Sequence, residues 1–145
     1  KNHPSYNRLA FQRARQRGDF WFGIWTVDAD GGGPLEVHSN ATYAAVNPAW
    51  SPDGSKIAFA TVNCSPAAKG QDRRFDGDDI WMVRHDGTGL AQITSETCAE
   101  WYPCWSVDGR IYFIARREGA QNIWSARPLA GLLDDVSAAK QEEPK

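Results

Sequence analysis

The sequence lacks the marks of several large protein classes. Its three cysteines have neither C-x-x-C spacing nor a C-x-x-C-H haem motif, which disfavours zinc and haem sites. Its longest apolar runs are too short to cross a bilayer. Sixteen Lys and Arg against eighteen Asp and Glu give a net charge of −2, without the basic excess of a nucleic-acid-binding protein. We therefore expect a soluble globular domain without a cofactor.

Catalytic motifs are missing as well. The sequence contains no G-x-S-x-G nucleophile elbow and no phosphate-binding P-loop. Ser51 lies in a tight Ser-Pro-Asp-Gly turn. Its spacing to Asp53 is similar to that in the Asp-box of sialidases, but Gly54 follows Asp53 directly and the Trp of that motif is missing. The three histidines are isolated from one another. We expect that the chain is not an enzyme.

The sequence instead repeats one strand pattern three times. The copies are residues 47–59 with 79–87, residues 102–113 with 122–127, and residues 8–11 with 23–31. Five of the seven tryptophans recur in register with these copies: Trp25, Trp50, Trp81, Trp105 and Trp124. Aromatic residues favour half-buried pleated surfaces, so we interpret the five as packing residues. A repeated strand pattern of this period indicates a radial or stacked β architecture, because one copy cannot bury its own faces.

The middle copy predicts a four-stranded antiparallel sheet. Its expected strands cover residues 44–51, 56–63, 79–85 and 90–94, with a Pro-Asp-Gly turn after the first and an Asp-Gly turn after the third. In the second strand, Ile57 and Phe59 share one face while Ala58 and Ala60 share the other. Both faces are apolar or small, which favours a sheet packed between two neighbours.

The repeat divides the chain into four parts. We expect a first sheet over residues 1–40 with a shortened inner strand, a complete sheet over 41–96, and a third over 97–128 that lacks its outer strand. Residues 129–145 form a short C-terminal tail that is helical or irregular. Because the sequence begins at Lys1, without methionine or a signal-like segment, it is either a processed mature chain or a fragment.

These residues resemble the TolB-like, WD-type β-propeller repeat of bacterial envelope proteins. The middle copy matches every element of that repeat, through Pro48, Trp50, Ser51, Pro52, Asp53, Gly54, Ile57, Phe59, Ile80, Trp81, Asp86, Gly87, Ile93 and Thr94. The last copy matches through its third strand with Val107 in place of Pro, and the first matches over residues 9–37. The resemblance implies an all-β, partial β-propeller of about three four-stranded antiparallel blades. It also implies a periplasmic or secreted location in a bacterium.

Three blades are too few to close a ring, since propellers of this family usually have six. A blade face of about 400 Å² follows from about six residues and four strands at ordinary spacing. Exposure of its apolar part would forfeit about 6 kcal/mol. We therefore expect a second copy of the chain, or another polypeptide, to complete the ring. No transmembrane segment is expected, and membrane association would come through a partner.

The loops between second and third strands are the candidate binding surface. They mix arginine and aromatic residues, as interface hot spots do, and they meet Trp101 at one rim. The candidate partner-binding residues are Arg15, Arg17, Phe20, Trp21, Phe22, Arg73, Arg74, Phe75 and Trp101. Asp76, Asp78 and Asp79 are weak candidates for calcium ligands, because they lack the spacing of an EF-hand loop.

The blade arrangement also places two cysteines at that rim. Cys64 ends one strand and Cys98 begins the next inner strand, which makes Cys64–Cys98 the preferred disulfide in an oxidising compartment. The alternative is three buried thiols.

The leading functional hypothesis is a non-enzymatic interaction and scaffolding module of a bacterial extracytoplasmic assembly. It would present rim loops on a rigid scaffold. Two alternatives stay open. One is the gating propeller of a serine peptidase of the prolyl-oligopeptidase kind, and the other is a structural subunit of a larger redox or envelope complex.

Overall fold

The computed structural model describes residues 7–17, 21–64 and 77–133, which form three antiparallel β-sheets. Sheet 1 contains β1 (Arg8–Ala14), β2 (Phe22–Asp28) and β3 (Leu35–His38). Sheet 2 contains β4 (Tyr43–Trp50), β5 (Lys56–Asn63), β6 (Gly77–Arg84) and β7 (Ala91–Gln92). Sheet 3 contains β8 (Glu100–Trp105), β9 (Ile111–Arg117) and β10 (Ala120–Ala126). The all-β, partial β-propeller fold expected from the repeat is confirmed.

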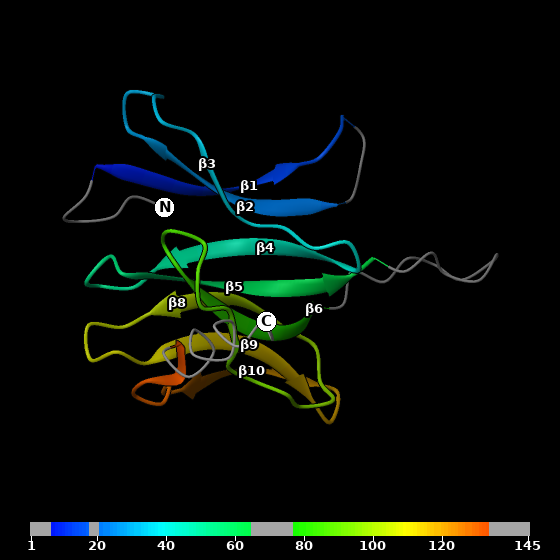
Figure 1. The fold of residues 1–145 in the computed structure, drawn as a ribbon. Helices are drawn as coiled ribbons and strands as arrows, with labels where there is room; N and C mark the ends of the chain where they lie inside the picture. The colour runs from blue at the N-terminus through cyan, green and yellow to red at the C-terminus, as the bar shows by residue number, and fades with distance from the viewer. Residues whose placement is uncertain (1–6, 18–20, 65–76, 134–145) are drawn as a thin grey trace, which may run out of the picture.

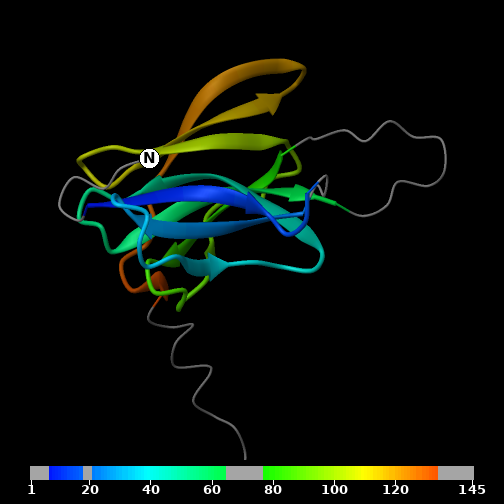
Figure 2. The ribbon, with the colours of Figure 1, turned by 90° about the horizontal axis from the view of Figure 1, so that it is seen from above.

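The sheets stack in the order of the sequence, each on the next (Figure 1). The view from above looks down the stack and shows the hairpin of β9 and β10, in orange, extending beyond the overlapping strands of sheets 1 and 2 (Figure 2). The shortened inner strand expected before β1 falls at residues 2–6, outside the described residues, as does most of the C-terminal tail. Within the described ranges, no helix is long and apolar enough to span a membrane.

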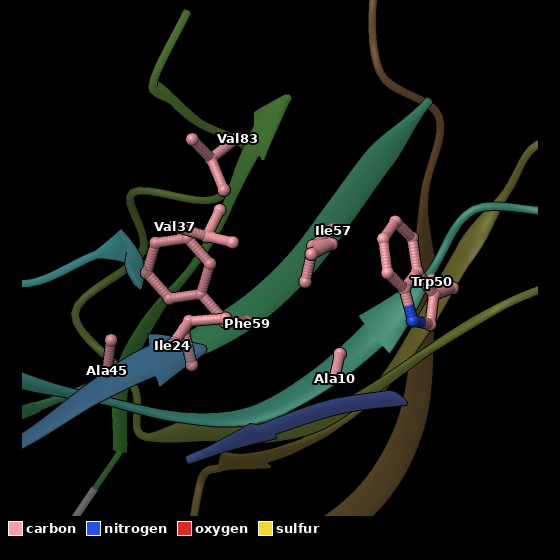
Figure 3. Close-up of a cluster of buried hydrophobic side chains, with 8 residues drawn as sticks. All are labelled: Ala10, Ile24, Val37, Ala45, Trp50, Ile57, Phe59 and Val83. Atoms are coloured by element: carbon pink, nitrogen blue, oxygen red, sulfur yellow. The ribbon is translucent and has the colours of Figure 1, made fainter. Parts of the chain in front are cut away.

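Two apolar clusters hold the stack together. Between sheets 1 and 2, the buried side chains are Ala10, Ile24, Val37, Ala45, Trp50, Ile57, Phe59 and Val83 (Figure 3). Between sheets 2 and 3, Ala58, Ala60 and Ile80 pack with Ile111, Phe113 and Ala115. The alternation predicted for β5 is therefore confirmed, since Ile57 and Phe59 face sheet 1 while Ala58 and Ala60 face sheet 3.

The turn after β4 is fixed by the side chain of Asp53. Its Oδ1 accepts hydrogen bonds from Ser51 Oγ at 2.6 Å and from the Ser55 amide at 3.0 Å. Burial acts to raise the pKa of Asp53, but these hydrogen bonds, with one from Ser55 Oγ and the charge of Lys56, outweigh it and lower the pKa to about 2. Gly54 supplies the positive φ of 72° that the turn requires.

The turn after β6 brings sheet 2 against the outer strand of sheet 1. Gly87 has a φ of 86°, and a Cβ there would lie 2.8 Å from the carbonyl oxygen of Val37. Gly109, in the first turn of sheet 3, has a φ of 80° and nothing within 4 Å. Both positions therefore favour glycine because of their positive φ, but only Gly87 also lacks room for a Cβ atom.

We expect Gly87→Ala to lower the free energy of unfolding by about 1 kcal/mol more than Gly109→Ala. Both variants bear the cost of a left-handed alanine, while Gly87→Ala adds a steric clash with backbone. Urea denaturation of the two variants measures the difference. Equal losses would show that β3 yields to the added methyl group.

Candidate functional site

The first cavity on the predicted rim lies within sheet 1. It has a volume of about 310 Å³, and its lining includes Arg13, Arg15, Trp21, Phe22 and Trp25. The guanidinium of Arg13 lies 4.7 Å from the ring centroid of Trp25, in cation–π geometry. The Arg15 amide donates to the Trp21 carbonyl at 3.0 Å, which closes the loop across its undescribed tip. The cavity therefore presents arginine and tryptophan together.

A second cavity, of about 320 Å³, joins all three sheets. It is lined by Gln12 and Phe22 of sheet 1, Val46, Asn47 and Val62 of sheet 2, and Trp101 and Tyr102 of sheet 3. Phe22 lines both cavities. The amide of Asn47 donates to Gln12 Oε1 at 2.9 Å, which ties the inner strand of sheet 2 to sheet 1. The structure thus brings Phe22 and Trp101, both predicted rim residues, to one hollow.

The remaining predicted residues divide into two groups. Arg15 and Arg17 are exposed near the end of β1, and the ring of Trp101, another predicted residue, lies 5.8 Å from the guanidinium of Arg116. The other candidates lie outside the residues whose side chains the structure describes: Phe20, Arg73, Arg74, Phe75, Asp76 and Asp78. The partner-binding role of the whole set stays a prediction.

Two residues of the second cavity were missed by the sequence reasoning. Asn47 and Tyr102 have φ angles of 54° and 56°, and each precedes a proline at an irregularity in strand register. They occupy the same position of the repeat, and Tyr102 is 60% exposed. The recurrence of a residue before proline in two copies of the repeat was the available signal, although that position ordinarily favours extended backbone, from which both φ angles depart.

Asp79, the described member of the candidate calcium set, makes contacts within sheet 2. Its Oδ2 accepts a hydrogen bond from Gln92 Nε2 at 2.9 Å, and its amide donates to Thr61 Oγ1 at 3.2 Å. Among the described side chains, no three metal-ligating groups gather in one place. In the described part of the chain, the hydrogen bonds of Asp79 therefore link neighbouring strands of sheet 2.

A buried carboxylate that the sequence did not single out lies at the start of β8. The Glu100 side chain is fully buried, with Oε1 3.7 Å from Arg117 Nη2. Its Oε2 has no hydrogen-bond partner among the described residues. Burial raises the pKa of Glu100 and the charge of Asp79 adds to this, against hydrogen bonds from Thr94 and Cys98 and the charge of Arg117. Burial of the Glu100 carboxylate between sheets 2 and 3 therefore lowers the stability of the fold.

The described cysteines are not joined in the structure, which differs from the preferred Cys64–Cys98 disulfide. Cys98 Sγ donates to Glu100 Oε1 at 3.6 Å, and Cys64 Sγ donates to the Val62 carbonyl at 3.4 Å. Burial and the nearby Glu100 raise the pKa of the Cys98 thiol, which favours the protonated donor. Cys104 is exposed, so three buried thiols are not found either. A disulfide in an oxidising compartment stays a prediction.

Comparison with known proteins extends the fold assignment. No family model matches the chain. Over 54 residues, 37% of the chain, it is 41% identical to the Tol-Pal system protein TolB of Escherichia fergusonii, of which the match covers 12%. The chain thus spans a small part of that curated relative.

Three solved structures share the arrangement. A TolB-type protein of Agrobacterium tumefaciens has a TM-score of 0.62 at 22% identity, over 82% of this chain and 41% of its own. TolB of Acinetobacter baumannii has a TM-score of 0.60 at 16% identity, over 82% and 26%. A structure from a study of two prolyl endopeptidases has a TM-score of 0.58 at 18% identity, over 84% and 19%. The chain therefore has the fold of a TolB-like β-propeller, of which it presents three sheets.

Proposed function

We propose that the chain is a non-enzymatic protein-interaction and scaffolding module of a bacterial extracytoplasmic assembly. The likeness to TolB, a protein of the Tol-Pal system, supports this class of function and a periplasmic location. The mechanism is rigid presentation: the sheets hold the rim residues in place, so a partner is bound with little ordering cost.

The observation that supports the proposal most is an apolar sheet face that no described residue covers. Each Ile-Trp strand directs its isoleucine to the sheet that follows it. Ile24 is 0% exposed against sheet 2, and Ile80 is 0% exposed against sheet 3. The equivalent Ile123 is 76% exposed. Where the stack ends, the same repeat position faces solvent.

The exposed isoleucine belongs to a wider apolar surface, which we call the outer face of sheet 3. Register places Ile123 beside Ile114. Tyr112, two residues before Ile114 on the same face, is 41% exposed. Contiguous apolar surface of this kind marks an interaction site, and its most economical cover is a further propeller sheet. A second copy of the chain, or another polypeptide with the remaining sheets, would supply it.

Native mass spectrometry with light scattering tests the proposal. We expect the chain to associate with itself or with a companion polypeptide, and Ile123→Asp to weaken this association by placing a charge on the covered face. Val107→Asp is the matched control, because Val107 is 94% exposed in the turn between β8 and β9, outside the strands that form that face. A stable, well-folded monomer without companions would contradict ring completion.

The rim is tested separately, with whichever companion is found. Trp21→Ala and Trp101→Ala remove aromatic surface from the two rim cavities. Unchanged affinity in both variants would place the binding surface elsewhere.

A second candidate is a gating propeller of a serine peptidase. The likeness to the prolyl endopeptidase structure favours it, since similar folds accompany that chemistry. The sequence of the whole gene separates the candidates: a downstream hydrolase domain with a G-x-S-x-G elbow would favour the peptidase.

A further inference from the structure

The outer edge of β10 differs from the equivalent edges of the other two sheets. In sheet 1, β2 pairs with β3, and in sheet 2, β6 pairs with β7. In sheet 3 no described strand pairs with β10 on that side, and six of its seven residues are exposed. We propose that this edge binds an extended, acidic segment of another polypeptide, which adds to sheet 3 as a fourth strand. This deepens the proposed scaffolding function and rests on it.

Sheet 2 shows how such a strand would bind. The amide of Ile80 donates to Thr94 Oγ1 at 2.8 Å, and its carbonyl accepts from the amides of Ile93 at 2.8 Å and Thr94 at 3.2 Å. The main chain of Ile80 thus points to the outer edge. Ile123 is its counterpart, because Trp81 pairs with Phe59 as Trp124 pairs with Phe113. The main-chain groups of Ile123 therefore face the open edge.

An edge of this kind is a ready template for strand addition. Unpaired amide and carbonyl groups supply affinity, and side chains on alternate positions supply specificity. The strands of sheets 1 and 2 that fill this position belong to the same repeat, so the geometry of the added strand is already present twice in this molecule.

Charges around β10 define the chemistry of the segment. The guanidinium of Arg117 lies 3.8 Å from the Trp124 ring centroid and also reaches Glu100. Arg110 Nη1 lies 3.5 Å from Ser125 Oγ, and Arg127 contacts Asp108. Arg110 and Arg127 share the carboxylate of Asp108, so their charges are partly balanced. Arg117 over Trp124 is the positive charge that favours an acidic residue in the partner.

Sheet 1 offers an internal precedent for this charge pattern. Arg13 lies over Trp25, and the strand register places Glu36 of β3 directly opposite Trp25. Sheet 3 repeats the arginine over the tryptophan, but no described strand supplies the carboxylate. The segment that fits is therefore an acidic residue between two apolar residues, as in residues 35–37 of β3 itself.

A peptide with the sequence of residues 33–39, Gly-Pro-Leu-Glu-Val-His-Ser, is the probe. We expect saturable shifts of the Ile123 and Ser125 amides when it is titrated into the isotope-labelled full chain and followed by NMR. Changing its Glu to Lys should weaken binding by up to about fivefold, the range of an exposed ion pair.

Two variants of the chain complete the test. Ile123→Pro removes the edge-facing amide without removing a bond to β9, and should abolish the shifts at Ser125. Ile123→Thr changes the same side chain but keeps the amide, and should retain them. An unshifted β10 in the wild-type chain, or equal binding to the Pro and Thr variants, overturns the proposal. If the Ile123→Pro variant does not fold, comparison of the Glu and Lys peptides on the wild-type chain still tests whether binding requires the acidic residue. If strand addition is not observed but native mass spectrometry still shows association, the scaffolding proposal is retained and only the strand-addition proposal is rejected.

Discussion

Ile80→Ala is expected to lower the free energy of unfolding by about 2–5 kcal/mol. Ile80 is fully buried between sheets 2 and 3, where it packs with the cluster that includes Ala60 and Phe113. Truncation removes buried apolar surface and leaves a cavity that the two sheets cannot fully close. Chemical denaturation followed by tryptophan fluorescence measures the loss.

Ile123→Ala is the matched control, because the residue holds the same repeat position. Ile123 is 76% exposed, and its truncation in the isolated chain should change stability by less than about 0.5 kcal/mol. If a partner covers the outer face of sheet 3, the effect of Ile123→Ala should rise when the partner is present. A large loss in the isolated chain would mean that Ile123 is buried in solution.

Glu100→Gln is expected to stabilise the chain at neutral pH by about 1–3 kcal/mol, because it removes a buried charge and keeps the shape of the side chain. Burial, with the charge of Asp79, raises the pKa of Glu100 above its ordinary value of 4.5. The folded chain therefore holds the proton more tightly than the unfolded chain does. The stability this provides is complete below pH 4.5 and is lost as pH rises through the raised pKa.

The difference between variant and wild type should thus be small at low pH and grow as pH rises. Urea denaturation at a series of pH values measures it, and using the difference cancels the contribution of Asp53, whose pKa is lowered to about 2. A constant difference across the series would show that the pKa of Glu100 is the same in the folded and unfolded chain. A loss of stability at high pH would show that the Arg117 ion pair dominates instead.

Much of the fold follows from local patterns in the sequence. Period-two alternation in residues 57–60 predicted which side chains face each neighbouring sheet, because successive strand residues point to opposite faces. The Pro-Asp-Gly turn was predictable because Gly tolerates the positive φ found at Gly54. These features depend on neighbours a few residues away.

The missed features depend on distant contacts. Glu100 is buried because sheets 2 and 3 meet over it, whereas a glutamate beside a tryptophan gives no local sign of burial. Asn47 and Tyr102 reach the second cavity only through a register irregularity and the approach of Gln12 from another sheet. The exposure of Ile123 is likewise a property of the stack, since its local sequence matches that of Ile80.

The segment after β10 does not continue outward along sheet 3 but returns to sheet 2. Leu133 is 3% exposed, and it packs on Met82 and Ala91. Sheet 3 is consequently attached to sheet 2 at both ends, through the chain that enters β8 and through the packing of Leu133. We expect this contact to couple the unfolding of the last sheet to that of the central sheet.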